Sequence, residues 1–428
     1  MARKMKDSGI EWIGKIPEGW EITKIKHIVS SVTDIDHFMP DSAEFGIPYL
    51  MIGDLKDLSS SIDWDSSKKI SIEDYKKLSI KSRPQIGDII FARYASIGTT
   101  CYIDTDRDFL VSYACLTIHP SDLIIGKFLS YYLKSSSFAE DVLRRTNSNT
   151  QGNVGKDSLV NATIVLPSII EQTQIVNFLD AKCSDINAML SKTRSSIEEY
   201  KKLKQAVITQ AVTKGVRGER EMKDSGVEWI GEIPKEWDIL DLVAHTSMLT
   251  PMRDRPENLD GPIPWIRIED FDGKYISSSK ASLGVSKETV RSMNLKIYPV
   301  GTILCTSSCI MGKCAIVSRE LVSNQRFIGI IPDQNTCENF LYYLMLSNSE
   351  RMNYLATGAL QANLSRSSFE HLKVQFPSYQ EQKEISDYLD TKCAEIDKLI
   401  AKKEQLVKEL ESYKKSLIYE VVTGKREV

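Results

Sequence analysis

The chain has 428 residues, of which 42% are hydrophobic and 26% charged, a composition typical of a globular protein with about two or three domains. Because it has no run of about 18 apolar residues and no apolar signal region at the N-terminus, we expect no membrane-spanning helix and a cytoplasmic location. The net charge of −3 excludes DNA binding through a strongly basic surface alone, so partners would have to supply part of the phosphate contacts.

The chain begins with a tryptophan-containing segment that recurs 217 positions later. Residues 5–14 have the sequence MKDSGIEWIG and residues 222–231 the sequence MKDSGVEWIG. Each copy is followed by an Ile-Pro pair and a second tryptophan, Trp20 or Trp237, and we call these two segments the tryptophan boxes. A repeat of this length is too long for a solenoid unit. It predicts a duplicated domain together with its connector.

The interior of each half has a mixed pattern of strand and helix signals. Residues 47–55 match residues 263–271, and both begin with an Ile-Pro-aromatic run. The segments 86–93 and 300–305 each predict a strand entered through a tight turn. A short helix is predicted after each strand, at 128–133 and at 340–344. We therefore expect a small α/β domain in each half.

Each half ends in a long helical stretch. Leu166-Pro167-Ser168 and Phe376-Pro377-Ser378 each end an extended segment, and a glutamate three residues after each serine has capping-box spacing. These two starts are 210 positions apart, so the first half holds seven more residues between its tryptophan box and its helix. Both stretches then continue for about 45 residues up to Gly215 and Gly424, where left-handed C-caps are expected.

Residues along both stretches recur at alternating spacings of four and three, which predicts a seam that packs against a partner helix. The seam positions are Leu179, Cys183, Ile186, Leu190, Thr193, Ile197, Tyr200, Lys204, Val207 and Ala211, followed in the second copy by Leu389, Cys393, Ile396, Ile400, Lys403, Val407, Leu410, Lys414, Leu417 and Val421. We expect rods of roughly 63–68 Å, paired antiparallel within one chain because a domain separates them. A parallel pair between two chains is the alternative. The polar positions Thr193, Lys204, Lys403 and Lys414 either help to set the helix register or are solvated positions near frayed ends.

The motifs of nucleotide and methyl-group chemistry are missing from the sequence, and we predict no cofactor. It has no phosphate-binding G-x-x-x-x-G-K-[ST], no dinucleotide-binding G-x-G-x-x-G and no Asn/Asp-Pro-Pro-aromatic tetrapeptide like that of amino-methyltransferases. The five histidines are scattered, as expected for surface or core positions. The cysteine cluster Cys305, Cys309, Cys314 and Cys337 fits zinc spacing poorly, so we expect reduced, buried thiols and no metal site.

The candidate functional residues lie in loops where the two halves differ. We predict loops 93–100 and 144–153 in the first half, and 306–313 and 357–363 in the second, as DNA contacts, because their side-chain types can bind base edges or phosphates. Ordinary polar turns are the alternative. The candidate DNA-binding residues are Arg93, Tyr94, Ser96, Thr99, Arg144, Arg145, Thr150, Gln151, Asn153, Ser307, Ser308, Lys313, Gln361 and Asn363.

These features together resemble one known family. The tryptophan boxes, the Pro-Ser-x-x-Glu-Gln helix starts and the Phe/Tyr-Leu-Asp-x-Lys-Cys-x-x-Ile segments at 178–186 and 388–396 are similar to the DNA-specificity subunit of type I restriction–modification systems. The resemblance covers nearly the whole chain. It implies an α/β (mixed α+β) fold with a pseudo-two-fold internal repeat, in which two target recognition domains are joined by two long antiparallel coiled-coil helices. The implied segments are domains at 1–167 and 216–377 and conserved spacer helices at 168–215 and 378–428.

The resemblance also implies a function without catalysis by this chain. Each domain would bind one half of an asymmetric, split site in double-stranded DNA. The helices would dock two adenine-specific methyltransferase subunits, and motor-nuclease restriction subunits would complete the complex. Two other classes stay open: a coiled-coil scaffold without DNA contact, and a nuclease using Asp104, Asp106 and Asp108. The latter cluster has no counterpart in the second half and is typical of a solvated turn.

Overall fold

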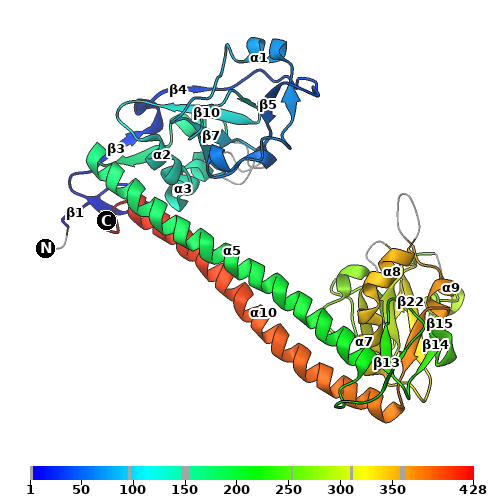
Figure 1. The fold of residues 1–428 in the computed structure, drawn as a ribbon. Helices are drawn as coiled ribbons and strands as arrows, with labels where there is room; N and C mark the ends of the chain where they lie inside the picture. Colours follow the sequence, from blue (N-terminus) through cyan, green and yellow to red (C-terminus); the bar gives the residue numbers. More distant parts are fainter. Residues whose placement is uncertain (1–2, 95–97, 146–153, 252–253, 309–311, 357–362) are drawn as a thin grey trace. The chain divides into compact units, whose positions relative to one another are not determined.

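A computed structural model describes residues 3–94, 98–145, 154–251, 254–308, 312–356 and 363–428 (Figure 1). The chain divides into two compact units: residues 1–194 with 405–428 form the first unit, and residues 195–404 form the second. Each unit contains a mixed α/β domain and a segment of each of two long helices. Among the described residues, no helix combines the length and the apolar character that crossing a bilayer would need.

The domain of the first unit is built from short strands and helices ahead of a long helix. Its strands are β1 (Met5–Asp7), β2 (Lys15–Pro17), β3 (Glu21–Lys24), β4 (Val29–Thr33), β5 (Ile47–Leu50), β6 (Lys69–Ile70), β7 (Ile89–Ala92), β8 (Thr100–Tyr102), β9 (Leu110–Val111), β10 (Cys115–Pro120) and β11 (Thr163–Leu166). Its helices are α1 (Ile72–Leu78), α2 (Gly126–Leu133), α3 (Ser136–Arg145) and α4 (Lys156–Val160), and α5 (Ile169–Lys214) follows.

The domain of the second unit repeats this order with small changes. Its strands are β12 (Met222–Asp224), β13 (Glu232–Pro234), β14 (Asp238–Asp241), β15 (Thr246–Leu249), β16 (Ile263–Ile266), β17 (Tyr275–Ile276), β18 (Gly284–Val285), β19 (Ile303–Thr306), β20 (Cys314–Val317), β21 (Val322–Ser323), β22 (Phe327–Pro332) and β23 (Lys373–Phe376). Its helices are α6 (Lys287–Ser292), α7 (Glu338–Ser347), α8 (Ser349–Leu355) and α9 (Arg366–Glu370), and α10 (Tyr379–Val422) follows.

The sheets of the two domains correspond one to one. The central sheet has the order β4-β10-β7-β8 in the first unit and β15-β22-β19-β20-β17 in the second, so the second gains one edge strand. The smaller sheet β6-β5-β9 matches β18-β16-β21, and both contain one antiparallel and one parallel pair. The pairs β1-β2 and β11-β3 match β12-β13 and β14-β23. The duplicated α/β fold predicted from the sequence is confirmed.

In the first unit α5 and α10 pair antiparallel. Lys414 Nζ donates to Asn187 Oδ1 at 3.0 Å, and Arg194 forms an ion pair with Glu411 at 2.5 Å. Arg194 comes after Asn187 along α5, whereas its partner Glu411 comes before Lys414 along α10, so the two helices run in opposite directions. Burial of the seam supplies most of the stability of this pairing. Apolar side chains of both segments join the core of the domain, and the buried ones are Ile175, Val176, Leu179, Cys183, Ile186, Leu190, Leu417, Ile418, Val421 and Val422.

In the second unit the same helices pair with the same sense. Lys204 Nζ lies 2.7 Å from Asp397 Oδ2, and Lys403 Nζ lies 5.7 Å from the centre of the Tyr200 ring. Lys204 and Lys414 are 210 positions apart, and so are Asn187 and Asp397, so one polar cross-helix contact is made twice. The contacts of Lys204 with Asp397 and of Lys414 with Asn187 support a role for these lysines in setting the helix register. A shift of one helix by one turn along the other would break both contacts.

The long helices begin and end as their sequences predict. Ser168 Oγ accepts from the backbone N–H of Glu171 at 3.4 Å, and Glu171 Oε2 accepts from the N–H of Ser168 at 3.2 Å, which completes a capping box. Ser378 caps the N–H of Glu381 in the same way at 3.4 Å. Gly215 and Gly424 have φ angles of +75° and +71°, the left-handed conformation expected just past a helix end.

Candidate nucleic-acid interface and its supporting contacts

The tryptophan box of the first unit is fastened to the start of α5. Trp20 is buried, and its Nε1 donates to Glu171 Oε1 at 3.1 Å. The guanidinium of Arg3 contacts the same oxygen and lies 5.1 Å from the centre of the Trp20 ring. Partial burial raises the pKa of Glu171, but hydrogen bonds from Trp20 and Ser168 outweigh it, so the pKa is lowered from its ordinary value. The second tryptophan of the box and the glutamate at the helix start, which both recur in the sequence, are therefore hydrogen-bonded to each other.

The second unit repeats this contact with its own residues. Trp237 Nε1 donates to Glu381 Oε2 at 3.0 Å, and Arg220 lies 2.6 Å from Glu381 Oε1 and 5.1 Å from the ring centre of Trp237. Glu381 is buried, with 2% of its side chain exposed. A buried carboxylate requires such partners to offset the loss of hydration.

The glutamine after each of these glutamates has a separate role. Gln172 is fully buried; its Oε1 accepts from the N–H of Ile125 at 2.8 Å, and its Nε2 donates to the carbonyls of Leu123 and Pro167 at 3.2 and 3.0 Å. Gln382 makes the same three contacts with Cys337, Asn335 and Pro377. The amide therefore ties the start of α2 or α7 to the start of a long helix. The sequence motif Glu-Gln predicted only the cap.

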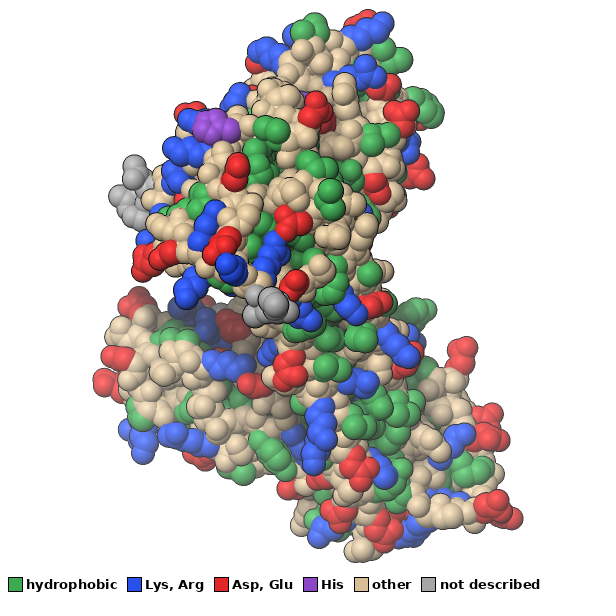
Figure 2. Space-filling view, turned by 90° about the vertical axis from the view of Figure 1, so that its left-hand side faces the viewer, with side chains coloured by type: hydrophobic (Ala, Val, Ile, Leu, Met, Phe, Trp, Pro, Cys, Tyr) green, Lys and Arg blue, Asp and Glu red, His purple; other side chains and the backbone are tan. Residues whose placement is uncertain are grey.

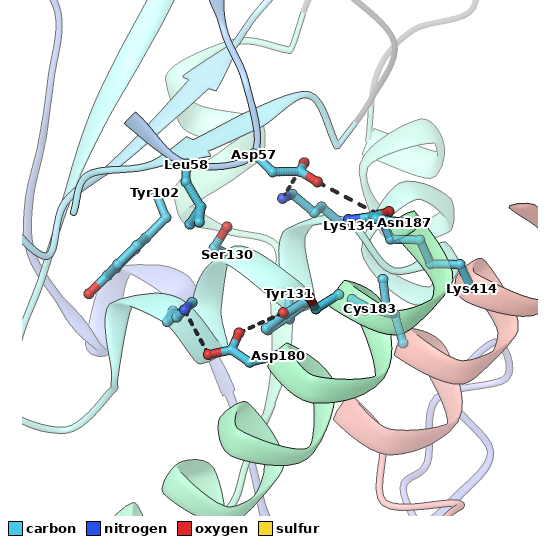
Figure 3. Close-up of a pocket in the computed structure, with 13 residues that line it drawn as sticks. Asp57, Leu58, Tyr102, Ser130, Tyr131, Lys134, Asp180, Cys183, Asn187 and Lys414 are labelled. Carbon is cyan, nitrogen blue, oxygen red and sulfur yellow. Dashed lines mark hydrogen bonds and ion pairs between the residues drawn. The ribbon is translucent and has the colours of Figure 1, made fainter. Parts of the chain in front are cut away.

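A pocket of about 290 Å³ lies where the first domain meets the helices (Figure 3). Tyr131 of α2 points at the carboxylate of Asp180 on α5, and Lys127 of α2 contacts the other oxygen of that carboxylate. Tyr131 Oη donates to Oδ1 at 2.8 Å, and Lys127 Nζ donates to Oδ2 at 2.7 Å. Burial and the neighbouring carboxylate raise the pKa of Tyr131, which keeps its hydroxyl a donor.

Asp390 is held similarly in the second unit, but the lysine comes from another element. Tyr343 Oη donates to Asp390 Oδ1 at 2.6 Å, and Lys274, just before β17, contacts the same oxygen. At the position of Lys127 the second unit has Asn339. The second unit therefore keeps a lysine contact to the aspartate, but this lysine comes from a different element of the fold. These contacts join each domain to the start of its long helix.

Arg93 begins the first predicted loop and follows β7, and Val154 is the first residue after the second predicted loop. The N–H of Arg93 donates to Ala114 O at 2.9 Å, and the carbonyl of Arg93 accepts from the N–H of Val154 at 3.0 Å. The N–H of Ser112 donates to Leu50 O at 2.9 Å. Backbone bonds therefore connect the segments after β5, β7 and β9 with the segment before α4.

The second unit has the same three backbone bonds. The N–H of Ser307 donates to Arg326 O at 2.8 Å, the carbonyl of Ser307 accepts from Leu364 N–H at 2.9 Å, and Asn324 N–H donates to Ile266 O at 3.3 Å. This frame aligns Arg93 with Ser307. The predicted loops 93–100 and 306–313, which begin at Arg93 and Thr306 and were predicted as counterparts, are therefore matched one position out. Thr306 is the last residue of β19 and corresponds to Ala92. The shift of one residue arose because strand ends are set by pairing across the sheet, which local sequence does not show.

The predicted residues of the first unit differ in how free their side chains are. Arg93 is largely buried, lies 3.3 Å from Asp34 and stacks at 5.7 Å on Tyr94, whose side chain is half exposed. Thr99 lies just before β8 and is partly buried. Four predicted residues lie outside the described residues: Ser96, Thr150, Gln151 and Asn153.

Arg144 and Arg145, at the end of α3, are engaged within the first unit. Arg144 lies 4.6 Å from the ring centre of Trp12 and 2.8 Å from Glu140. Arg145 lies 3.0 Å from the buried carboxylate of Asp141. Both contacts give these arginines a structural role beside the predicted one.

Three predicted residues of the second unit lie together. Ser308 forms an isolated bridge with Asn363, next to the Ser307–Leu364 bond, and Ser307 and Asn363 line a hollow of about 390 Å³ that also includes Gln325 and Arg366. Lys313 is exposed just before β20, and its backbone pairs with Thr306. Gln361 lies outside the described residues.

Sequence reasoning missed a second hollow beside this one, of about 280 Å³. The two hollows share Gln325, and the second is lined by the polar residues Arg255, Arg267, Asn324, Gln325 and Arg326. A signal was present in the matched Ile-Pro-aromatic segments, where Arg267 stands opposite Met51. The loop before β22 gave no such signal, because its proximity depends on strand pairing.

Charged side chains of both signs are interspersed on the face drawn in Figure 2, rather than gathered in one basic area. The whole-chain count of 55 basic and 58 acidic residues agrees with this distribution. Among the described residues no group of three or more His, Cys, Asp or Glu side chains has the arrangement of a metal site, although Cys309 lies outside them. Cys305 and Cys314 are buried, and their sulfurs lie 2.8 Å apart across β19 and β20.

The family of type I restriction modification DNA specificity domains matches this chain twice, at residues 17–199 and 235–409. The chain belongs to this family. It is the specificity subunit of a type I restriction–modification system, a non-catalytic part of an enzyme complex.

Individual relatives agree with this assignment. The type I restriction enzyme MjaVIII specificity subunit of Methanocaldococcus jannaschii is 23% identical over 432 residues, covering 96% of this chain and 94% of that protein. The MjaIX specificity subunit of the same organism is 34% identical over 179 residues, covering 40% of this chain and 41% of that protein. A solved chain from work on complex assembly and conformational transition of the type I R-M system has a TM-score of 0.73 at 15% identity, covering 96% of this chain and 99% of that chain. At that identity the likeness concerns the fold alone.

Proposed function

We propose that this specificity subunit binds a split, asymmetric DNA site, with residues 1–167 contacting one half and residues 216–377 the other. The observation that carries the proposal is the shared backbone frame at the ends of β7 and β19, which presents different side chains in the two units. Met51, Ser112 and Ala114 in the first unit are replaced by Arg267, Asn324 and Arg326 in the second. One frame with two chemistries suits two different half-sites, since bases are distinguished by the donors and acceptors that meet them.

The proposed contacts are the loops named from the sequence together with the hollows that adjoin them in the second unit. Because basic and acidic residues are nearly balanced, the methyltransferase subunits supply much of the phosphate neutralisation in this proposal. Residues 168–215 and 378–428 act as spacers, and the two domains contact the same face of B-DNA when their half-sites are about 10 bp or a multiple of that apart.

The test is an exchange of residues 1–160 for those of a relative with a known site. The hybrid is expressed with its methyltransferase, and adenine methylation is mapped by methylome sequencing. We expect one half-site to change and the other to stay. A change in both half-sites, or in neither, contradicts the domain assignment. Insertion of seven residues into both long helices at matched positions is expected to change only the spacer, and an unchanged spacer contradicts the role of the helices.

Two methyltransferase subunits are proposed to dock on the long helices at repeat-related places. Met189 and Tyr413 are exposed apolar residues of the first unit, and their counterparts 210 positions away, Leu399 and Leu203, are exposed in the second. Exposed apolar residues at equivalent positions are typical of protein contact sites. Two identical partners need two such places, and the internal repeat supplies them.

Docking is tested by glutamate substitutions in one unit at a time. Met189→Glu with Tyr413→Glu is expected to leave complexes with one methyltransferase subunit, and Leu203→Glu with Leu399→Glu to do the same at the other place. Native mass spectrometry reads the stoichiometry directly. Lys192→Glu, at another exposed position of α5, is the control that should keep two subunits. Loss of neither subunit from the paired variants contradicts this docking surface.

A further inference from the structure

The second unit carries a cluster of three arginines, and at the frame positions of two of them, Arg267 and Arg326, the first unit has Met51 and Ala114. Arg255 precedes β16, Arg267 follows it, and Arg326 lies in the turn between β21 and β22. All three line the hollow of about 280 Å³ beside Gln325 and Asn324. Among the described residues that line it, there is no acidic side chain.

The backbone holds these side chains at one place. The bond from Asn324 N–H to Ile266 O sets the turn against the end of β16, and Asn324 Oδ1 accepts from the N–H of Arg326 at 3.1 Å. The carbonyl of Arg326 accepts from Ser307, a predicted DNA contact. The arginine positions are therefore part of the same surface as the predicted reading loop.

The guanidinium groups of these arginines remain accessible to a ligand. Arg255 and Arg326 are exposed, while Arg267 is partly exposed and lies 3.0 Å from Glu269, whose side chain is 60% exposed. Exposed ion pairs contribute little and exchange readily. The Nε of Arg267 is buried and has no hydrogen-bond partner among the described residues. An unpaired buried donor of this kind is satisfied when a ligand supplies an acceptor.

We propose that this arginine cluster binds the major-groove edge of a guanine in the half-site of the second domain. The proposal rests on the proposed function and specifies one base type for it. Guanine presents two adjacent acceptors, O6 and N7, which match the paired N–H groups of arginine. A phosphate offers similar paired oxygens. Three features favour a base edge over a phosphate: the recess, the buried Trp265 in its wall, and the neighbouring amides of Asn324 and Gln325. Amide side chains pair with base edges, as they do with adenine, and they carry no positive charge that would attract a phosphate.

The internal repeat supplies the test substitutions. Arg267→Met and Arg326→Ala install in the second domain the residues that the first domain has at the same places of the frame, Met51 and Ala114. Arg326→Lys keeps the charge but loses the paired donors. Arg291→Ala, an exposed arginine on α6 outside the lining of the hollow, is the matched control.

The experiment measures binding by the full chain in complex with its methyltransferase subunits. The DNA is a set of duplexes that contain the recognition site found by methylome sequencing. Each guanine of the second half-site is replaced by 7-deazaguanine, which lacks N7, or by hypoxanthine, which keeps O6 and N7. For the wild type we expect 7-deazaguanine at one position to weaken binding roughly 5- to 150-fold and hypoxanthine there to be tolerated. The three variants should bind the intact site more weakly and lose nothing further with 7-deazaguanine, while Arg291→Ala follows the wild type.

Three results would overturn the proposal. One is a second half-site without guanine on either strand. Another is a uniform loss of affinity on all sequences in Arg326→Ala, with a salt slope reduced by about one, which identifies a phosphate contact. The third is unchanged binding by the variants. Failure of the proposed function is distinct, since the wild-type complex would then show no split site.

Discussion

Replacement of Gln172 by leucine tests how the domain of the first unit is joined to its long helix. The side chain is fully buried and makes three hydrogen bonds to backbone atoms. Leucine has a similar volume but no polar atom, so the N–H of Ile125 and the carbonyls of Leu123 and Pro167 would lose their partner. An unpaired buried N–H costs about 1–3 kcal/mol, and each lost carbonyl contact about 0.5–1.5 kcal/mol.

The added apolar surface of leucine offsets part of this loss, by about 1 kcal/mol. We therefore expect the free energy of unfolding of the first unit to fall by about 1–5 kcal/mol. For a unit of this size that corresponds to a lowering of the melting temperature by roughly 2–20 °C. Because Ile125 immediately precedes α2, the local effect should be concentrated at the start of that helix.

The assay is urea unfolding combined with hydrogen exchange measured by mass spectrometry. Peptides from residues 121–133 should exchange faster in Gln172→Leu, and peptides from residues 335–347 should stay at the wild-type rate. Gln382→Leu should show the reverse pattern. Gln174→Leu changes an exposed glutamine two residues along α5 and should alter stability by less than about 0.5 kcal/mol. Equal effects of Gln172→Leu and Gln174→Leu would refute the role assigned to the buried amide.

Three further changes probe the other contacts. The pKa of Glu171 is lowered in the folded chain, so its contribution to stability is present above the unfolded pKa near 4.3 and is lost as the pH falls through the folded pKa. In Glu171→Gln, the free energy of unfolding measured in urea should therefore depend less on pH between pH 5 and 3 than in the wild type. An unchanged pH dependence would contradict the role of this carboxylate. Gly215→Ala should destabilise by at least about 1 kcal/mol, because φ is +75° and the added carbon would lie 2.1 Å from the guanidinium of Arg220, whereas Gly218→Ala has open space; similar denaturation midpoints for both variants would contradict this. Asp180→Ala should cost about 2–3 kcal/mol by removing the acceptor of a tyrosine and a lysine, and calorimetry showing less than about 0.5 kcal/mol would indicate that the pair is solvated.

Local sequence was sufficient for the features that depend on neighbouring residues along the chain. The spacing of four and three along the seam requires a helix with one apolar face, and Ser168, Ser378, Gly215 and Gly424 mark its ends by capping chemistry that acts within a few residues. The duplication was evident from the matched tryptophan boxes. The α/β class, the antiparallel helices and the family were predicted on this basis and are confirmed.

The candidate site was predicted less completely. The loops after β7 and β19 were located because the halves differ there, but the residue matching was one position out. Arg255, Arg267 and Arg326 were missed since they belong to three separate loops of the sequence. Nothing in a local pattern indicates that a turn before β22 contacts the end of β16. Whether the predicted side chains bind DNA remains a prediction for the exchange and substitution experiments above.

The sequence by itself therefore determined the duplication, the helices with their caps and the family of this specificity subunit, because periodicity and capping are interactions between near neighbours. Only the tertiary structure decided what the repeated glutamate and glutamine hold, and which arginines share one hollow. Those contacts join residues such as Trp20 and Glu171, 151 positions apart. Their distances depend on how the sheets pair and pack, which no short segment specifies alone.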